Sequence, residues 1–227
     1  MKLKCLGSGS SGNCYLLEDN KEALIIEAGI SFREVKRALD FNIFKIVGVV
    51  VSHSHGDHAR RCYEYENVGI PVFKPYESVT GRQLCTFGNF VIHSFSLIHD
   101  VPCCGFLINH PDMGYFLYAS DTEYIKYRFA GSIAPNYILV EANYSADLID
   151  PGAENRTHVL TGHMELQTTL EFLRKNRSPA LQKVILCHLS SNNADPVGFE
   201  QEVKQVVGCP VWIAEKGLVV DVSLEPF

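Results

Sequence analysis

Short apolar runs recur along the chain and predict strands. The run over 46–51 is apolar without alternation, which is typical of a strand buried on both faces. A strand over 22–28 stops at Gly29. Further strands are predicted over 70–74, 89–95, 104–109, 115–119, 136–141, 183–187, 211–214 and 217–222. The chain is therefore expected to be rich in sheet.

Helical spacing appears near the beginning, the middle and the end of the chain. Ser31 and Glu34 have the spacing of a capping box, so a helix is predicted over 32–40. A second helix is predicted after Gly162, and a third over 195–208, with Asp as N-cap and Pro in the first turn. Together with the strands, these helices predict an α/β fold of two mixed sheets packed together and covered by helices. We expect a four-layer αββα sandwich.

Composition limits the class of protein. A chain of 227 residues with 46% apolar residues can bury one core, so a single domain over 1–227 is expected. No apolar run is long enough to span a bilayer, and the segment 1–7 lacks the apolar stretch of a signal peptide, so no membrane partner is expected. The eight scattered cysteines contain no Cys-x-x-Cys pair, which favours reduced thiols and a cytoplasmic location.

The net charge of −6 argues against a broad basic face that coats nucleic acid. It does not exclude a nuclease, because bound divalent cations can supply a local positive field. Small basic clusters stand at 33–37, 60–61 and 174–177. We expect each to be a solvated face and not a phosphate track.

Three histidines and an aspartate follow the most apolar strand within six residues. In extended chain His53 and His55 point the same way, so they can bind one metal ion. Gly56 permits a turn that presents Asp57 and His58 to a second ion. Imidazole and carboxylate ligands suit Zn, Mn or Fe, and two adjacent ions can bind both the attacked group and the leaving oxygen. The sequence therefore predicts a two-metal centre.

Other chemistry is less well supported. Surface histidines in a loop would be the plain alternative, but this density after a buried strand is unusual. A serine hydrolase is disfavoured because the chain contains no Gly-x-Ser-x-Gly elbow. Cys103 and Cys104 lie near His99, but neighbouring side chains in a strand face opposite ways, so burial in the core is expected.

The His-x-His-x-Asp-His motif after an apolar strand resembles the signature of the metallo-β-lactamase superfamily, and matching pieces follow in order along the chain. The resemblance implies that His53, His55 and His99 hold one ion, that Asp57, His58 and His188 hold the other, and that Asp121 bridges them. Glu27 stands where the superfamily usually has aspartate, and it is expected to support the histidine loop from behind the ligands. His93 is the alternative to His99, but it lies within a predicted strand and not after one.

Four further segments, 7–13, 141–143, 162–163 and 188–193, resemble the YycJ/WalJ/VicX branch, which is related to RNase Z and RNase J. Members of that branch are regarded as 5′-to-3′ exonucleases acting on DNA. The resemblance implies phosphodiester hydrolysis with two divalent ions, Zn or Mn. Tyr144 departs from the branch pattern, which often has histidine at that position.

The resemblance also suggests substrate contacts. His163 follows Gly162 at a predicted helix start, where backbone N–H groups favour phosphate, and it is expected to contact the scissile phosphate or donate a proton. Capping of that helix is its alternative role. The Gly-Ser loop 7–13 is either a flexible turn or a phosphate site. As a phosphate site it would act through Ser10 and Ser11, and Ser190 and Asn192 are likewise expected to bind the terminal phosphate of a substrate.

The metal-ligand motif, together with what the resemblance implies, predicts a metal-dependent phosphodiesterase in which Asp57 and His163 are catalytic. A 5′-to-3′ exonuclease that acts on 5′ ends of DNA is favoured, with RNA as a second substrate. One alternative is a hydrolase of a small ester, such as a cyclic phosphodiester or a thioester. Another is a non-catalytic, metal-binding regulatory protein. The chain has no room for the inserted arm of many larger nucleases, which favours a compact branch or a small substrate.

Overall fold

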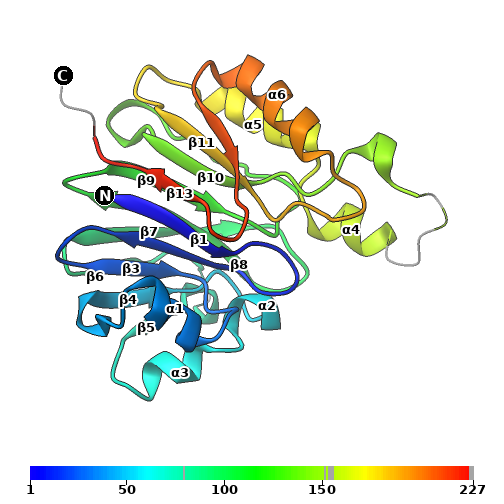
Figure 1. The fold of residues 1–227 in the computed structure, drawn as a ribbon. Coiled ribbons are helices and arrows are strands. Elements are labelled where there is room, and N and C mark those ends of the chain that lie inside the picture. The colour runs from blue at the N-terminus through cyan, green and yellow to red at the C-terminus, as the bar shows by residue number, and fades with distance from the viewer. Residues whose placement is uncertain (79, 151, 153–155, 225–227) are drawn as a thin grey trace.

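Two mixed β-sheets packed face to face form the centre of the molecule (Figure 1). The computed structural model describes residues 1–78, 80–150, 152 and 156–224. The first sheet has the order β13-β1-β2-β3-β4-β5 and the second the order β12-β11-β10-β9-β8-β7-β6. Strands of the first sheet are β1 (Lys2–Gly7), β2 (Cys14–Glu18), β3 (Ala23–Ile26), β4 (Ile46–Val50), β5 (Val72–Phe73) and β13 (Val219–Asp221). Strands of the second are β6 (Leu84–Phe87), β7 (Phe90–Leu97), β8 (Cys103–His110), β9 (Gly114–Ala119), β10 (Tyr137–Glu141), β11 (Lys183–Cys187) and β12 (Val211–Ile213).

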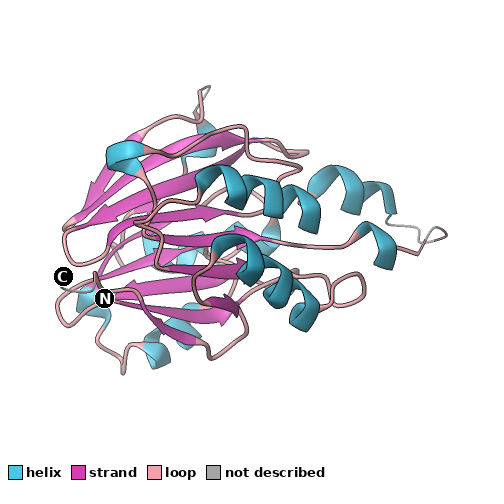
Figure 2. Cartoon of the chain, turned by 90° about the horizontal axis from the view of Figure 1, so that it is seen from above, coloured by secondary structure: helices cyan, strands magenta, loops and turns pink. Residues whose placement is uncertain are grey.

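Helices cover the outer face of each sheet (Figures 1 and 2). The first sheet is covered by α1 (Phe32–Ala38) and α3 (Cys62–Glu66), and the second by α5 (Leu166–Asn176) and α6 (Pro196–Val207). Two further helices are α2 (Gly56–Ala59) and α4 (Arg156–Gly162). Residues of α1 and α3 share an apolar core with β3 and β4, and residues of α5 and α6 share another with β10 and β11. A third core lies between the sheets. These three apolar layers confirm the predicted αββα sandwich.

The pairing of strands explains where a site can form. Strands β3, β4 and β5 run parallel, as do β9, β10, β11 and β12. Parallel strands bring their carboxyl ends to the same edge of a sheet, which is the usual place of a ligand site in α/β folds. The ends of β3, β4, β9 and β11 all lead into the predicted site residues, and β10 ends at Glu141, which lies beside them.

Most predicted elements are confirmed, with shifted ends. The third helix begins at Pro196 and stops before Gly208, whose φ of 71° lies in the left-handed region. The last strand is shorter than predicted, covering Val219–Asp221, and the strand predicted over 70–74 is reduced to Val72–Phe73. Helix α4, which ends at Gly162, was not predicted.

The predicted capping box is wrong. Ser31 is the N-cap of α1, but its side chain makes no capping hydrogen bond. The Phe32 N–H donates instead to Glu64 Oε2, at 2.8 Å. Glu34 pairs with Lys216 Nζ, also from a distant part of the chain, at 2.6 Å. A distant carboxylate therefore binds the first N–H of the helix, and a distant lysine engages the Glu34 carboxylate.

Two further features bear on the sequence predictions. None of the helices within the described ranges combines the length and the apolar character needed to cross a membrane. All eight cysteines are free thiols. Both Cys103 and Cys104 are buried, as predicted.

Candidate metal centre

Three residues with positive φ turn the chain at the ends of strands. Glu27 follows β3 with φ 68°, Asp121 follows β9 with φ 55°, and His188 follows β11 with φ 54°. Positive φ is uncommon for residues other than glycine and costs conformational free energy, and it tends to cluster at functional sites. All three side chains are buried and lie in one region, at the carboxyl ends of the strands.

The first candidate ligand group contains His53, His55 and His99, whose ligand atoms lie within 4.8 Å of one another. The ring centroids of His53 and His55 are 4.7 Å apart, as expected for alternate residues of an extended segment. His99 comes from the loop after β7, and its Nε2 lies 3.3 Å from Nδ1 of His55. His93, the alternative ligand, is exposed on β7 and belongs to none of the ligand groups among the described residues.

The second candidate group contains Asp57, His58 and His188, again with ligand atoms within 4.8 Å. Helix α2 begins at Gly56 and presents Asp57 and His58 from its first turn. Asp57 Oδ2 lies 3.4 Å from His58 Nε2 and 3.5 Å from His188 Nε2.

Asp121 stands between the two groups. Its Oδ2 lies 3.0 Å from His58 Nε2, and its Oδ1 lies 3.7 Å from His188 Nε2. It also forms a ligand group with His53 and His58, so it reaches a histidine of the first group as well. This is the placement that a bridging carboxylate requires.

The chemistry of these donors fits divalent metal ions. Nε2 of His53 is buried and has no hydrogen-bond partner among the described residues, whereas Nδ1 lies 2.8 Å from Ser52 Oγ. Burial, aided by the charge of His58, lowers the pKa of His53 to about 2. The ring is therefore neutral, with a lone pair available, which is the form of histidine that binds metal. Three imidazoles with carboxylates nearby make a suitable ligand set for a transition-metal ion.

Glu27 supports the histidine loop from behind. Its carboxylate accepts hydrogen bonds from the Ser52 N–H at 3.2 and 3.3 Å, and its Oε2 lies 3.3 Å from Nδ1 of His58. Glu27, Ser52 and His58 are all fully buried. This contact fixes the ring of His58 so that Nε2 points toward Asp57 and Asp121.

Asn13 is a site residue that the sequence analysis missed. Its Nδ2 lies 2.8 Å from His58 Nε2 and 3.2 Å from Asp57 Oδ2, and its Oδ1 accepts a hydrogen bond from the Gly9 N–H at 2.7 Å. Asn13 therefore ties the Gly-Ser loop to the second ligand group. The one available signal was its position as the last residue of that loop.

A close backbone approach holds this part of the site together. The Asn13 N–H donates to the Asp57 carbonyl at 2.7 Å, and the Gly29 N–H donates to the Asn13 carbonyl at 2.9 Å. A Cβ atom at position 29 would lie 1.7 Å from the Asp57 carbonyl oxygen, so only glycine fits there. Gly29, where the strand over 22–28 was predicted to stop, is thus needed for the approach itself.

Glu141, which is buried, and His163, which is half-buried, form a pair beside the second group. Glu141 Oε1 lies 2.7 Å from His163 Nδ1, and His163 Nδ1 lies 3.5 Å from Asp121 Oδ1. Burial lowers the pKa of His163, but the charges of Glu141 and Asp121 outweigh it and raise that pKa above its usual value. The sequence analysis noted Glu141 only as part of a motif and did not assign it a role.

The prediction that His163 opens a helix is wrong. It lies between α4 and α5, and α5 begins at Leu166. The N-cap of α5 is Glu165, whose carboxylate accepts hydrogen bonds from the N–H groups of Gln167 and Thr168. The N-terminal amides of α5 therefore already have an acceptor, and any phosphate contact of His163 depends on its imidazole.

The four residues predicted to bind a terminal phosphate, Ser10, Ser11, Ser190 and Asn192, line one cavity of about 470 Å³. His163 and His188 line the same cavity. Ser8 locks the Gly-Ser loop in place, because its Oγ accepts hydrogen bonds from the Tyr15 hydroxyl at 2.9 Å and the His188 N–H at 3.0 Å. The loop is thus not a free turn but one wall of a cavity at the candidate metal centre.

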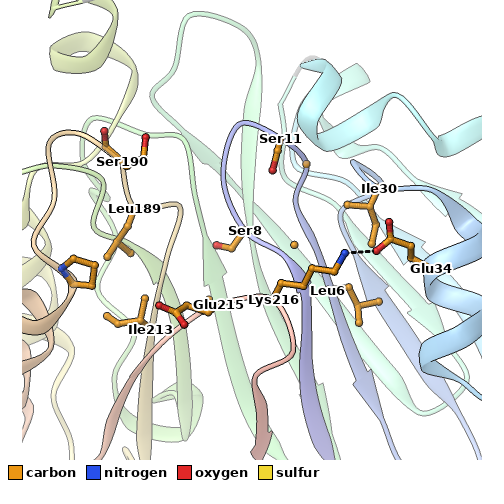
Figure 3. A pocket seen from close by; sticks show the side chains of 15 residues that line it. Leu6, Ser8, Ser11, Ile30, Glu34, Leu189, Ser190, Ile213, Glu215 and Lys216 are labelled. Atoms are coloured by element: carbon orange, nitrogen blue, oxygen red, sulfur yellow. Dashed lines mark hydrogen bonds and ion pairs between the residues drawn. The ribbon is translucent and has the colours of Figure 1, made fainter.

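A second cavity, also of about 470 Å³, adjoins the first (Figure 3). The two share Ser8, Ser11, Ser190 and other residues of the same two loops. Leu6, Ile30 and Ile213 give the second cavity an apolar lining, and the Lys216–Glu34 ion pair lies at one side of it (Figure 3).

Two helix-covered mixed sheets with His/Asp ligand groups at the strand ends define the metallo-β-lactamase class of fold. The family model of the metallo-β-lactamase superfamily matches residues 7–62, which contain the Gly-Ser loop and the His-x-His-x-Asp-His motif. Among solved structures, YhfI from Bacillus subtilis superposes with a TM-score of 0.70 at 20% identity, covering 96% of this chain and 98% of that one. The short form of human tRNase Z gives 0.66 at 15% identity, with 99% and 100% covered. The chain therefore has the metallo-β-lactamase fold, and its segment 7–62 matches the model of that superfamily.

Curated relatives are also similar over most of the chain. Exodeoxyribonuclease WalJ of Streptococcus pneumoniae is 26% identical, covering 85% of this chain and 82% of the relative. Exodeoxyribonuclease YycJ of Bacillus anthracis is 24% identical, covering 97% and 92%. These are the branch that the sequence motifs resemble.

Proposed function

We propose that this protein hydrolyses phosphodiester bonds of DNA and removes nucleotides from a 5′ end, with two divalent ions, Zn or Mn, as cofactors. The observation that carries the proposal is the meeting of two ligand groups at Asp121, beside the Glu141–His163 pair. The names of two curated relatives, both exodeoxyribonucleases, support DNA as the substrate.

The residues present would divide the work between them. His53, His55 and His99 would hold one ion, Asp57, His58 and His188 the other, and Asp121 both. Bound ions would polarise the phosphate and lower the pKa of the attacking water. Glu141 holds Nδ1 of His163, so Nε2 is the ring nitrogen that would donate a proton to the leaving oxygen.

The cavity beside His163 suits a terminal phosphate. Serine hydroxyls, an asparagine amide and loop N–H groups can all donate hydrogen bonds to phosphate oxygens. A terminal phosphate carries more charge than an internal one, and charge-assisted hydrogen bonds are stronger. A strand end would therefore be preferred over an interior position.

End selection is tested with a labelled single-stranded oligonucleotide that carries a 5′-phosphate, a 5′-hydroxyl or a blocked 5′ end. We expect stepwise shortening from the 5′ end, fastest with the 5′-phosphate, when products are resolved by size over time. Random internal cuts would overturn the exonuclease assignment. If the oligonucleotide is not cleaved but a cyclic phosphodiester is turned over rapidly, the substrate is a small ester and not DNA.

Replacement of His163 by alanine is expected to slow DNA cleavage by roughly 100- to 10,000-fold, the usual contribution of a general acid. The loss should be much smaller for a diester with a p-nitrophenolate leaving group, which departs without a proton. Both rates are measured with metal content determined in parallel, because the ligand atoms of His163, Asp121, Glu141 and His188 also lie within 4.8 Å of one another. A role as the acid requires that loss of His163 leave the metal content unchanged. Equal losses on both substrates would show that His163 does not act as the acid.

A further inference from the structure

We propose that a groove between the segment 124–128 and helix α5 binds the single-stranded nucleic acid that continues away from the candidate metal centre. Phosphates would contact Lys126, Arg128 and Lys175, and a base would stack on Tyr124. The groove has a volume of about 370 Å³. The inference rests on the proposed function, because it names the path of the same substrate.

The two walls of the groove start at the candidate site. Glu141 Oε2 accepts a hydrogen bond from the Thr122 N–H at 3.2 Å, where the first wall begins, and from the Met164 N–H at 3.3 Å, just before α5. The walls meet again where the Phe129 N–H donates to Asn176 Oδ1 at 2.7 Å. Between these points the segment and the helix run side by side, leading away from Glu141.

The length of the groove suits a short stretch of a strand. Its helical wall extends from Thr168 to Asn176, which at 1.5 Å per residue is about 12 Å. At the rise of about 3.4 Å per nucleotide that a strand has in duplex DNA, this is room for at most roughly three to four nucleotides, and for fewer in an extended single strand.

The first wall presents an alternating pattern. Ile125 and Phe129 are buried in the core, whereas Tyr124, Lys126 and Arg128 are exposed. Tyr124 is 47% exposed, so a large part of its ring is available to a ligand. Exposed aromatic rings interleaved with cations are how proteins hold single strands without reading sequence, because every base has a face that can stack.

Additional cations stand at the rim. The Arg82 guanidinium lies 5.3 Å from the centroid of the Tyr127 ring, and the Lys126 ammonium lies 5.4 Å from it. The Arg82 side chain also donates to the Tyr127 hydroxyl at 3.1 Å. Tyr127 therefore keeps two positive charges beside the groove.

The local charge is opposite to that of the chain as a whole. Lys126, Arg128 and Lys175 line the groove, and Glu171 is the only carboxylate among the described residues that do so. The chain carries a net charge of −6, so this concentration of cations is not a general property of its surface. Lys175 belongs to a basic cluster that was predicted to be a solvated face. Its Nζ lies 3.9 Å from Glu171 Oε2, so that carboxylate competes with a phosphate for Lys175.

The test measures binding of a labelled twelve-residue oligothymidylate by fluorescence anisotropy, over a range of salt concentrations and without added metal. Reversing the charges in Lys126→Glu/Arg128→Glu is expected to raise the Kd about tenfold or more. It should reduce the slope of log K against log salt by about 1.4, at about 0.7 per lost phosphate contact. The matched control is Lys2→Glu/Lys21→Glu, because both lysines are exposed and lie at the end of β1 and β2 that is away from the Gly-Ser loop. It should change the Kd less than twofold.

Two single substitutions separate stacking from charge. Tyr124→Ala should raise the Kd roughly 5- to 100-fold, the range for loss of a stacked base, whereas Tyr124→Phe should keep it near the wild-type value. Glu171→Gln should lower the Kd, because it removes the carboxylate from the groove. Three results would contradict binding of single-stranded nucleic acid in the groove. They are a charge-reversal variant with the same Kd as its control, equal Kd values for the two Tyr124 variants, and displacement of the oligonucleotide by polyglutamate at equal charge.

Turnover of bis(p-nitrophenyl) phosphate distinguishes this inference from the proposed function. That diester is too short to reach the groove, so all groove variants should turn it over at the wild-type rate. If the oligonucleotide binds through the groove but no diester is turned over, the groove remains a binding site and the proposed function is wrong. If DNA is cleaved but the groove variants behave like the control, the proposed function stands and the groove is not the binding site. Failure of the wild-type protein to bind the oligonucleotide would also contradict binding in the groove.

Discussion

Replacement of Asp57 by alanine is expected to abolish hydrolysis while the fold remains intact. Burial raises the pKa of Asp57, but hydrogen bonds from His188 and His58 outweigh it and hold that pKa well below its usual value. The carboxylate is therefore charged at neutral pH and sits in the second ligand group. Supporting residues around a metal typically contribute 10- to 100-fold in metal affinity or activity, so we expect loss of a ligand to cost about 1000-fold or more.

The fold should survive because Asp57 lies in the short helix α2 and not in a core. Activity on the oligonucleotide, metal content and the thermal midpoint are measured together. Asp112→Ala is the matched control, since Asp112 is exposed in the turn between β8 and β9. Asp57→Asn keeps the shape of the side chain and gives a second reading if the alanine variant is unstable. Turnover by either Asp57 variant within tenfold of wild type would show that this cluster is not the active site.

Removal of metal by a chelator is expected to abolish activity, and Zn or Mn should restore it. The two ligand groups predict about two ions per chain. Bound ions should also raise the thermal midpoint, because ions that bind only the folded state stabilise that state. At an ion concentration 1000 times the Kd, this stabilisation is about 4 kcal/mol. Metal analysis, activity after add-back and thermal melting measure the three effects.

Calcium serves as the control ion for this experiment. It prefers oxygen ligands, whereas the first group consists of three imidazoles, so it should restore little activity. Full activity in the metal-free protein would contradict metal dependence. A loaded protein with one ion per chain, and with Asp121 more than about 5 Å from it, would contradict the two-ion arrangement, in which ligand atoms lie about 2 Å from the metal.

The sequence by itself determined the parts of the site that are close together along the chain. His53 and His55 can share an ion because alternate residues of an extended segment point the same way, and the helix start at Gly56 presents Asp57 and His58. Apolar runs likewise located most strands of the second sheet within a few residues, because burial on both faces requires apolar residues throughout. For His99, Asp121 and His188, a resemblance to a family was needed.

Only the tertiary structure decided which distant residues meet. Asn13 reaches His58, Glu141 holds His163, and Glu64 accepts the Phe32 N–H at the start of α1. Each of these contacts joins segments that lie side by side only because of the order and direction of strands in the two sheets and the helices packed on them. Local pattern determines whether a residue is buried and in which element it lies. The partner that satisfies a buried polar group depends on what the folded chain brings within about 3 Å of it, and residues far away in sequence compete for that position.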